Sequence, residues 1–132
     1  MTIRDAVFPA DPQPLYEAHR YSPAIRSGDL LFVSGQVGVR EDGTPEPDFP
    51  KQVQLAFDHL EAVLKAAGAT FADVVDVTTF HTDQASQIDA VAAARLKAFG
   101  GPPYANWTVV GVTSLSGFDF EIKVIARVPA AA

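Results

Sequence analysis

Residues 120–127 read Phe-Glu-Ile-Lys-Val-Ile-Ala-Arg, with an apolar residue at every second position. This period of two is typical of a β-strand that packs one face on a core. The positions between them hold charged side chains and one isoleucine, so the opposite face is mixed in character. The segment therefore predicts a sheet that other elements cover on one face.

Two segments upstream have the periodicity of amphipathic helices. The first spans about 50–67, and its ends carry suitable residues. Pro50 fits a first turn, where its missing N–H costs nothing, and Gly68 fits a left-handed position after the last turn. The second helix is predicted over about 86–99 and ends at the Gly-Gly-Pro-Pro run 100–103.

Other segments are rich in β-branched and apolar residues and are predicted to be strands. Residues 1–20 carry three prolines and are expected to be an irregular lead-in, and residues 40–50 are expected to be a polar surface loop. In chain order, these strands are expected from Tyr21 to a turn at 27–29, over 30–33 with an end at 34–36, over 74–82 and over 108–112.

This order of elements predicts an α+β fold, a mixed β-sheet with two helices packed on one face. The 132 residues are enough for one domain, expected over 1–132. The side chains expected on the helix-free face are Val109, Ile125 and either Val75 or Val77. Such a face is more apolar than contact with water requires, so burial against another subunit is expected.

Composition excludes several classes of protein. The absence of cysteine rules out disulfides, thiolate metal sites and a cysteine nucleophile. Ten basic and sixteen acidic residues give a formal charge of −6, which disfavours a general nucleic-acid binder. No apolar run is long enough to span a bilayer, and residues 1–5 lack a secretory pattern, so a soluble cytoplasmic protein is expected.

No metal or nucleotide site is predicted. His19, His59 and His81 lie far apart in the chain and form no paired ligand motif, whereas zinc needs three or four converging ligands. Gly-rich nucleotide-binding motifs and the Gly-x-Ser-x-Gly motif of serine hydrolases are missing from the sequence. Ser34 has no base near it in the chain and is a poor candidate nucleophile.

Glu121 is the first candidate for chemistry, because it stands among apolar residues on the strand face opposite the helices. A carboxylate in a largely apolar cleft has its pKa raised by desolvation and can exchange protons near neutrality. The local sequence by itself favours a simpler explanation, an exposed ion pair with Lys123 or Arg127.

The second candidate is segment 102–108, which reads Pro-Pro-Tyr-Ala-Asn-Trp-Thr and contains the single tryptophan. Trp107, Tyr104 and Asn106 suit a pocket wall with hydrogen-bonding groups. An anchor in the core or in an interface explains the same residues equally well. The residues alone leave both interpretations open.

Four stretches resemble one known family. They are residues 21–30 (Tyr-Ser-Pro-Ala-Ile-Arg-Ser-Gly-Asp-Leu), 32–36 (Phe-Val-Ser-Gly-Gln), 66–68 (Ala-Ala-Gly) and 120–126 (Phe-Glu-Ile-Lys-Val-Ile-Ala). In this order and spacing they resemble the Rid family, also called YjgF or endoribonuclease L-PSP, over about 8–128. Segments 103–108 and 117–123 look most like its YjgH-type branch.

The resemblance implies a homotrimer of a chorismate-mutase-like α+β fold, with ligand clefts between subunits. In members such as RidA, which are 2-iminobutanoate/2-iminopropanoate deaminases, the cleft hydrolyses reactive enamines and imines to a carbonyl compound and ammonia. An arginine holds the substrate carboxylate, a tyrosine and a serine line the pocket, and a glutamate orders the attacking water. The resemblance implies no metal and no organic cofactor.

Carried over by position, the tyrosine falls on Tyr21, the serine on Ser34 and the glutamate on Glu121. The arginine does not carry over, because Trp107 stands in its place. A charged bidentate clamp is thereby replaced by a neutral indole with one donor. Losing such a partner costs about 2–5 kcal/mol for a ligand charge that must be desolvated.

Three functions follow from these residues. The first is an enamine or imine deaminase with an altered substrate, in which Trp107, Asn106 and Tyr104 help to bind a larger or uncharged molecule. The second is a non-catalytic small-molecule binding or regulatory trimer of the same fold. The third is the ribonuclease of the older family name, which the acidic composition disfavours. We expect a small-molecule ligand in an inter-subunit cleft, with neither membrane nor nucleic acid as a partner.

Overall fold

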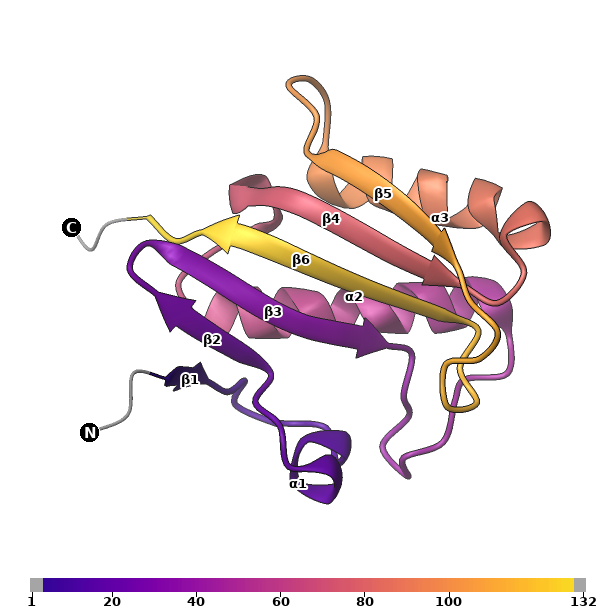
Figure 1. Ribbon diagram of the computed structural model, residues 1–132, viewed down its shortest axis with the longest axis horizontal. Helices are drawn as coiled ribbons and strands as arrows, with labels where there is room; N and C mark the ends of the chain where they lie inside the picture. The colour runs from indigo at the N-terminus through magenta and orange to yellow at the C-terminus, as the bar shows by residue number, and fades with distance from the viewer. Residues whose placement is uncertain (1–3, 130–132) are drawn as a thin grey trace.

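The computed structural model describes residues 4–129, in which six strands form one mixed sheet (Figure 1). The strands lie in the order β1-β2-β3-β6-β4-β5. β4 and β5 are parallel, and the other neighbouring pairs are antiparallel. The strands are β1 Asp5–Val7, β2 Ala24–Ser27, β3 Leu30–Val37, β4 Val74–His81, β5 Asn106–Gly111 and β6 Phe120–Arg127.

Two long helices lie on one face of this sheet, as the alternation in β6 predicts (Figure 1). The helices are α1 Leu15–His19, α2 Phe49–Ala66 and α3 Gln84–Phe99, with a 3-10 turn at Phe71–Asp73. The predicted α+β class with two helices on one face is therefore confirmed. None of the helices in the described part of the chain is long and apolar enough to cross a membrane.

The ends of α2 follow from its sequence. The Asp48 carboxylate accepts a hydrogen bond from the backbone N–H of Lys51, which satisfies a donor that the first turn leaves unpaired. Pro50 lies in the first turn, and Gly68 after the helix has a φ of +80°. Both end residues are used as the sequence predicts, and the observed helix begins and ends one residue earlier than expected.

The core lies between the two helices and the sheet. Phe57 of α2 stacks on Phe120 of β6, with ring centroids 6.3 Å apart and planes 7° apart. The alternate apolar residues of β6 are all fully buried beneath the helices. The other side chains of β6, Glu121 among them, therefore point to the helix-free face.

The expectation of an irregular lead-in over 1–20 is wrong within the described residues. β1 pairs antiparallel with β2 as an edge strand, and α1 follows Pro14 and ends at Arg20, which has a φ of +57°. Both elements are too short for a periodic pattern, and β1 exists because a distant strand offers it hydrogen bonds. The first three residues, on which the expectation of no secretory leader also rests, lie outside the described residues.

β3 does not end at 34–36 but continues to Val37. Its pairing with β6 shifts register between Val33 and Gln36 of β3. Such a bulge bends the strand and re-aims its side chains. Residue 35 is a glycine, and this becomes important for the site described below. The remaining predicted strands and helices differ from the observed ones by up to three residues at their ends.

The helix-free face is apolar near the β2 end of the sheet. Ile25, Phe32 and Ile125 are neighbours in register across three strands, and Phe32 is 41% exposed. Val75 is 48% exposed at an irregularity of β4, whereas Val77 is buried beneath the helices.

The expectation that Val109 lies on the helix-free face is wrong. Val109 pairs in register with Thr79, which is buried on the helix side of β4. Residues 108–112 are nearly all apolar, so their sequence contains no alternation that could assign the two faces of β5.

Candidate functional site

The Glu121 carboxylate lies between two adjoining hollows on the helix-free side of the sheet. The larger has a volume of about 510 Å³ and the smaller about 450 Å³, and Tyr21, Gly35 and Glu121 line both. The larger is walled by α1, by the bulge of β3 and by the loop between β5 and β6. Ser34 and Lys123 line the smaller one.

The bulge in β3 makes room for the carboxylate. A Cβ atom built on Gly35 would lie 2.5 Å from the carboxyl carbon of Glu121 and 2.7 and 2.8 Å from its oxygens. Real Cβ atoms do not approach other atoms this closely, so the carboxylate occupies space that only glycine leaves free. The missing side chain of Gly35 therefore determines where Glu121 points.

Glu121 forms no ion pair with any of the residues 4–129. Arg127 pairs with Asp29, at 3.5 Å, and neither of the two ion pairs in the described part of the chain involves Glu121 or Lys123. Burial raises the pKa of the Glu121 carboxyl above its usual value, and the charge of Lys123 only partly opposes this. The exposed ion pair that the local sequence favours is thus not formed, and Glu121 has the environment of a proton-exchanging group.

Tyr21 lies beside Glu121 and remains a phenol. Burial, together with the nearby Tyr16 and Glu121, raises the pKa of Tyr21 to about 12. The rings of Tyr21 and Tyr16 pack edge to face with centroids 5.1 Å apart. Behind them the Tyr16 hydroxyl donates to the amide oxygen of Gln36, at 3.0 Å, and accepts from Gln13, at 3.1 Å. This buried network holds the tyrosine pair against the site.

The Ser34 hydroxyl is already engaged. It donates to the backbone carbonyl of Ser22, at 2.8 Å, which ties β3 to the chain before β2. Its oxygen keeps a free lone pair, and because Ser34 lines the smaller hollow, it can accept one hydrogen bond there. Together, Tyr21, Ser34 and Glu121 are brought to one place, although nearly 90 residues separate Ser34 from Glu121 in the chain.

The other three sequence candidates lie elsewhere in the same chain. Trp107, Asn106 and Tyr104 are at the start of the edge strand β5. Glu121 is in register with Phe80 of β4, and Phe80 is in register with Val110 of β5. Val110 lies three residues after Trp107 along β5. One chain alone therefore does not bring these three residues beside Glu121.

Trp107 also faces the helix side, because it pairs in register with the buried Val77 and packs against the main core. Its indole N–H donates to the Thr79 hydroxyl, at 2.9 Å. The Asn106 side chain accepts from the backbone N–H of Val77, at 3.1 Å, and Tyr104 is 61% exposed. Asn106 thus supports the β4–β5 edge.

A fully buried histidine extends this network. One ring nitrogen of His81 lies 2.7 Å from the Thr79 hydroxyl, and the other, Nδ1, is buried without a hydrogen-bond partner among the described residues. Burial lowers the pKa of His81 below its ordinary value. The imidazole is therefore neutral in the folded protein at pH 7.

We expect the protein to lose stability through His81 as the pH falls below about 6.5, the ordinary histidine pKa. Below that pH the unfolded chain takes up a proton that the folded chain resists, at a cost of at most about 1.4 kcal/mol per pH unit. Urea unfolding between about pH 7.5 and pH 5.5 should show a smaller loss for His81→Gln than for wild type. The exposed His19→Gln is the control, and equal losses for all three proteins would contradict the assignment.

Sequence reasoning missed the walls of the larger hollow. Leu115 and Phe118 come from the loop before β6 and pack with Val37 in a small second core, and Leu15 packs on it from α1. Ser114 and Ser116 add hydroxyl groups to the lining. No local pattern marks these residues, because a loop that covers a sheet has no periodicity.

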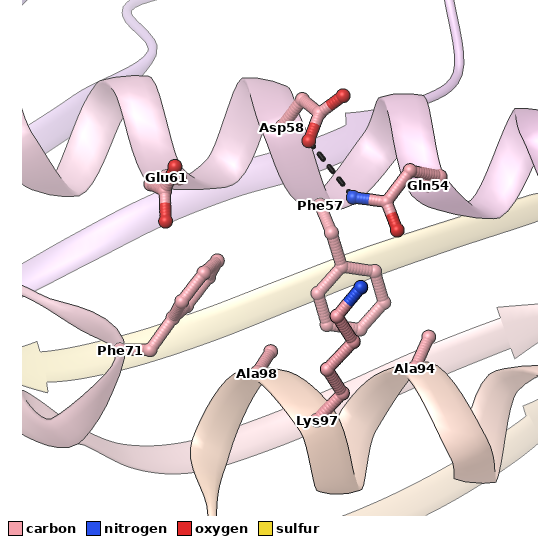
Figure 2. A pocket seen from close by; sticks show the side chains of 8 residues that line it. All are labelled: Gln54, Phe57, Asp58, Glu61, Phe71, Ala94, Lys97 and Ala98. Carbon is pink, nitrogen blue, oxygen red and sulfur yellow. Dashed lines mark hydrogen bonds between the residues drawn. The ribbon is translucent and has the colours of Figure 1, made fainter.

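A further cavity of about 240 Å³ lies between α2 and α3 (Figure 2). Phe57 and Phe71 form its floor, and Asp58, Glu61 and Lys97 stand at its rim. None of the candidate residues lines it, and it opens on the side of the sheet away from Glu121.

The fold and the carboxylate hollow define a class of proteins, and comparison with known families agrees. The family model for endoribonuclease L-PSP matches residues 12–128, so this chain belongs to that family, the Rid or YjgF family. Its α+β architecture is that of the family.

Individual relatives are close in both sequence and structure. The chain is 66% identical over 129 residues to the RutC family protein YjgH of Escherichia coli (strain K12), covering 98% of each chain. A solved structure described as protein YJGH has a TM-score of 0.93 and 65% identity, over 98% of this chain and all of that one. A 2-iminobutanoate/2-iminopropanoate deaminase of Dermatophagoides farinae is 32% identical over 111 residues, or 81% of each chain.

Proposed function

We propose that the protein is an enamine or imine deaminase, which hydrolyses a reactive C=N compound to a carbonyl compound and ammonia. One observation carries the proposal: a carboxylate that pairs with no cation of the described chain lies in a hollow, held where Gly35 leaves room for it. The imine deaminase among the relatives supports the reaction class.

In this mechanism Glu121 accepts a proton from a water molecule as the water oxygen attacks the imine carbon. The same proton is then passed to nitrogen, which gives a neutral carbinolamine. Glu121 next accepts the proton of the carbinolamine hydroxyl and returns it to nitrogen, so the C=O bond forms, the C–N bond breaks and ammonia leaves with the carboxylate regenerated. The raised pKa of Glu121 suits these transfers. A group that takes a proton and gives it back works best when its pKa lies near the operating pH. Tyr21, a phenol at neutral pH, donates a hydrogen bond to the substrate.

The complete site is proposed to form between subunits of a homotrimer. The apolar row of Ile25, Phe32 and Ile125 on the helix-free face supports this, because burying it against another copy removes it from water. A neighbouring copy would also supply Trp107, Asn106 and Tyr104, which one chain keeps away from Glu121. The ligand is a small molecule in that cleft, and the sequence relationship to the family supports the same assembly.

We expect analytical ultracentrifugation at micromolar concentration to show a species of three chains. Introducing a charge with Phe32→Glu should dissociate it, because an unpaired carboxylate would then be buried in the interface. The exposed Leu96→Glu on α3 is the matched control and should leave the assembly intact. A 14.1 kDa monomer for the wild-type protein would contradict the trimer.

We expect 2-aminoacrylate to be hydrolysed little faster than it decays spontaneously, because Trp107 offers no charged clamp for the carboxylate of so small a substrate. An assay with a dehydratase that generates the enamine would follow the release of keto acid. An arginine-bearing family member, assayed in parallel, should accelerate it strongly. Comparable acceleration by both proteins would contradict the altered substrate.

The second candidate is a non-catalytic binding or regulatory trimer that keeps the same cleft. The specific observation in its favour is Trp107, which replaces the arginine of the catalytic relatives. A panel of imines generated in situ by amine and amino-acid oxidases separates the two functions. Faster carbonyl release from any of them supports the deaminase, and ligand binding without turnover across the panel supports the binding protein.

A further inference from the structure

Arg95 of α3 is a cation that has no counter-ion within residues 4–129. Its guanidinium carbon lies 4.7 Å from the centre of the Trp107 ring, so the two planar groups are in contact. Neither of the two ion pairs formed by the described residues, Arg40 with Asp42 and Arg127 with Asp29, includes it.

The guanidinium is held in place, but most of its donors are unused. Its Nη2 donates to the backbone carbonyl of Ala105, at 2.6 Å. That bond uses one of five N–H groups, and Nε, which is buried, has no acceptor within the described part of the chain. Because Nε is buried, the donors left for an outside ligand are the remaining three N–H groups of Nη1 and Nη2. A half-buried guanidinium held in this way, with no carboxylate partner among the described residues, matches an oxygen anion from outside the chain.

Trp107 contributes by fixing the geometry. The indole is anchored by its N–H to the Thr79 hydroxyl, at 2.9 Å, and it packs on the core. The arginine that stacks on it therefore loses less side-chain entropy when an anion binds than a free surface arginine would. Lys97, two residues further along α3, is exposed and has no such support.

We propose that Arg95, stacked on Trp107, binds the carboxylate of a small organic acid. The inference rests on the proposed function to the extent that this acid is the substrate. The anion is then held by the guanidinium that lies over the indole of Trp107, and not by the side chain of residue 107 itself. The carboxylate is thereby displaced from where an arginine at 107 would hold it, so a larger imino acid fits better than 2-aminoacrylate.

The single tryptophan makes the binding directly measurable. Titration of the full chain with benzoate at constant ionic strength should change the Trp107 fluorescence in a saturable way. The neutral isostere benzamide should bind at least about tenfold more weakly. Arg95→Gln should weaken benzoate binding at least about tenfold, and Lys97→Gln, the matched control on the same helix, should leave it unchanged.

Arg95→Lys keeps the charge but loses the fork, so it should bind benzoate with intermediate affinity. It also guards against a folding defect in Arg95→Gln, which circular dichroism and thermal melts would reveal. Equal affinity of benzoate and benzamide, or wild-type affinity in both Arg95 variants, would overturn the proposal. Dissociation of the assembly by Arg95→Gln with no response to benzoate would also overturn it, since the acceptor would then be a carboxylate of a second copy.

Turnover measured on the same samples separates this proposal from the proposed function. Imine hydrolysis with unchanged KM in Arg95→Gln, together with unchanged benzoate affinity, would refute the carboxylate site and leave the deaminase intact. Benzoate binding that depends on Arg95, without hydrolysis of any imine, would refute the deaminase and retain the site.

Discussion

Replacing Glu121 with glutamine is expected to lower imine turnover by about 10²–10⁴-fold and to leave the fold and the assembly unchanged. Glutamine keeps the shape of the side chain but has no oxygen that accepts a proton at neutral pH. The carboxylate has no ion-pair partner in the described chain, so removing its charge breaks no salt bridge there. Steady-state kinetics on the best imine of the panel, with unfolding and sedimentation of each variant, would test this.

The pH dependence gives a second readout of the same group. Because the pKa of Glu121 is raised by burial, the acid limb of kcat/KM should lie above the ordinary range of glutamate. The limb should disappear in Glu121→Gln and persist in Glu61→Gln, an exposed glutamate on α2 that serves as the control. Wild-type turnover by Glu121→Gln would make Glu121 a structural residue and would favour the binding protein.

Gly35→Ala is expected to lower turnover about 10²-fold with little loss of stability. The new methyl group would compete for space with the Glu121 carboxyl group, whose carbon lies only 2.5 Å from where the Cβ atom would be. The carboxylate is the end of a flexible side chain, so it moves aside at small energetic cost but leaves its catalytic position. Kinetics should show a loss in kcat rather than in folding.

Gly38 provides the matched comparison, three residues away on the same part of the chain. A Cβ there would meet the backbone carbonyl of Gln52 in α2, which has no freedom to move aside. Gly38→Ala is therefore expected to destabilise the fold by about 1–3 kcal/mol while the folded fraction keeps its activity. If Gly35→Ala instead lost stability and kept kcat, Gly35 would have a packing role. The proposal that Gly35 sets the catalytic position of the Glu121 carboxylate would then be wrong.

Local periodicity is sufficient to determine the frame of this protein. The apolar stripe of α2, the end signals at Pro50 and Gly68 and the alternation in β6 each arise from residues within one element. They specify the two helices, the covered face of the sheet and the face on which Glu121 lies. The family relationship adds Tyr21 and Ser34 as neighbours of that glutamate.

Tertiary structure alone decided the remaining surroundings of Glu121. The bulge at Gly35 and the loop carrying Leu115 and Phe118 depend on contacts between segments far apart in the chain, and so does the pairing of β1 with β2 at the edge of the sheet. A sequence pattern with a period of two or 3.6 carries no information about such contacts.

The same distinction explains Trp107. Residues 108–112 show no alternation of polar and apolar side chains, so the sequence marks neither face of β5. The parallel register with β4 places Trp107 beside Val77, on the helix side, where Arg95 of α3 reaches its ring. The pairing of a cation with this tryptophan is therefore a product of strand register and helix packing, because a strand without polar–apolar alternation acquires its two faces only from its neighbours.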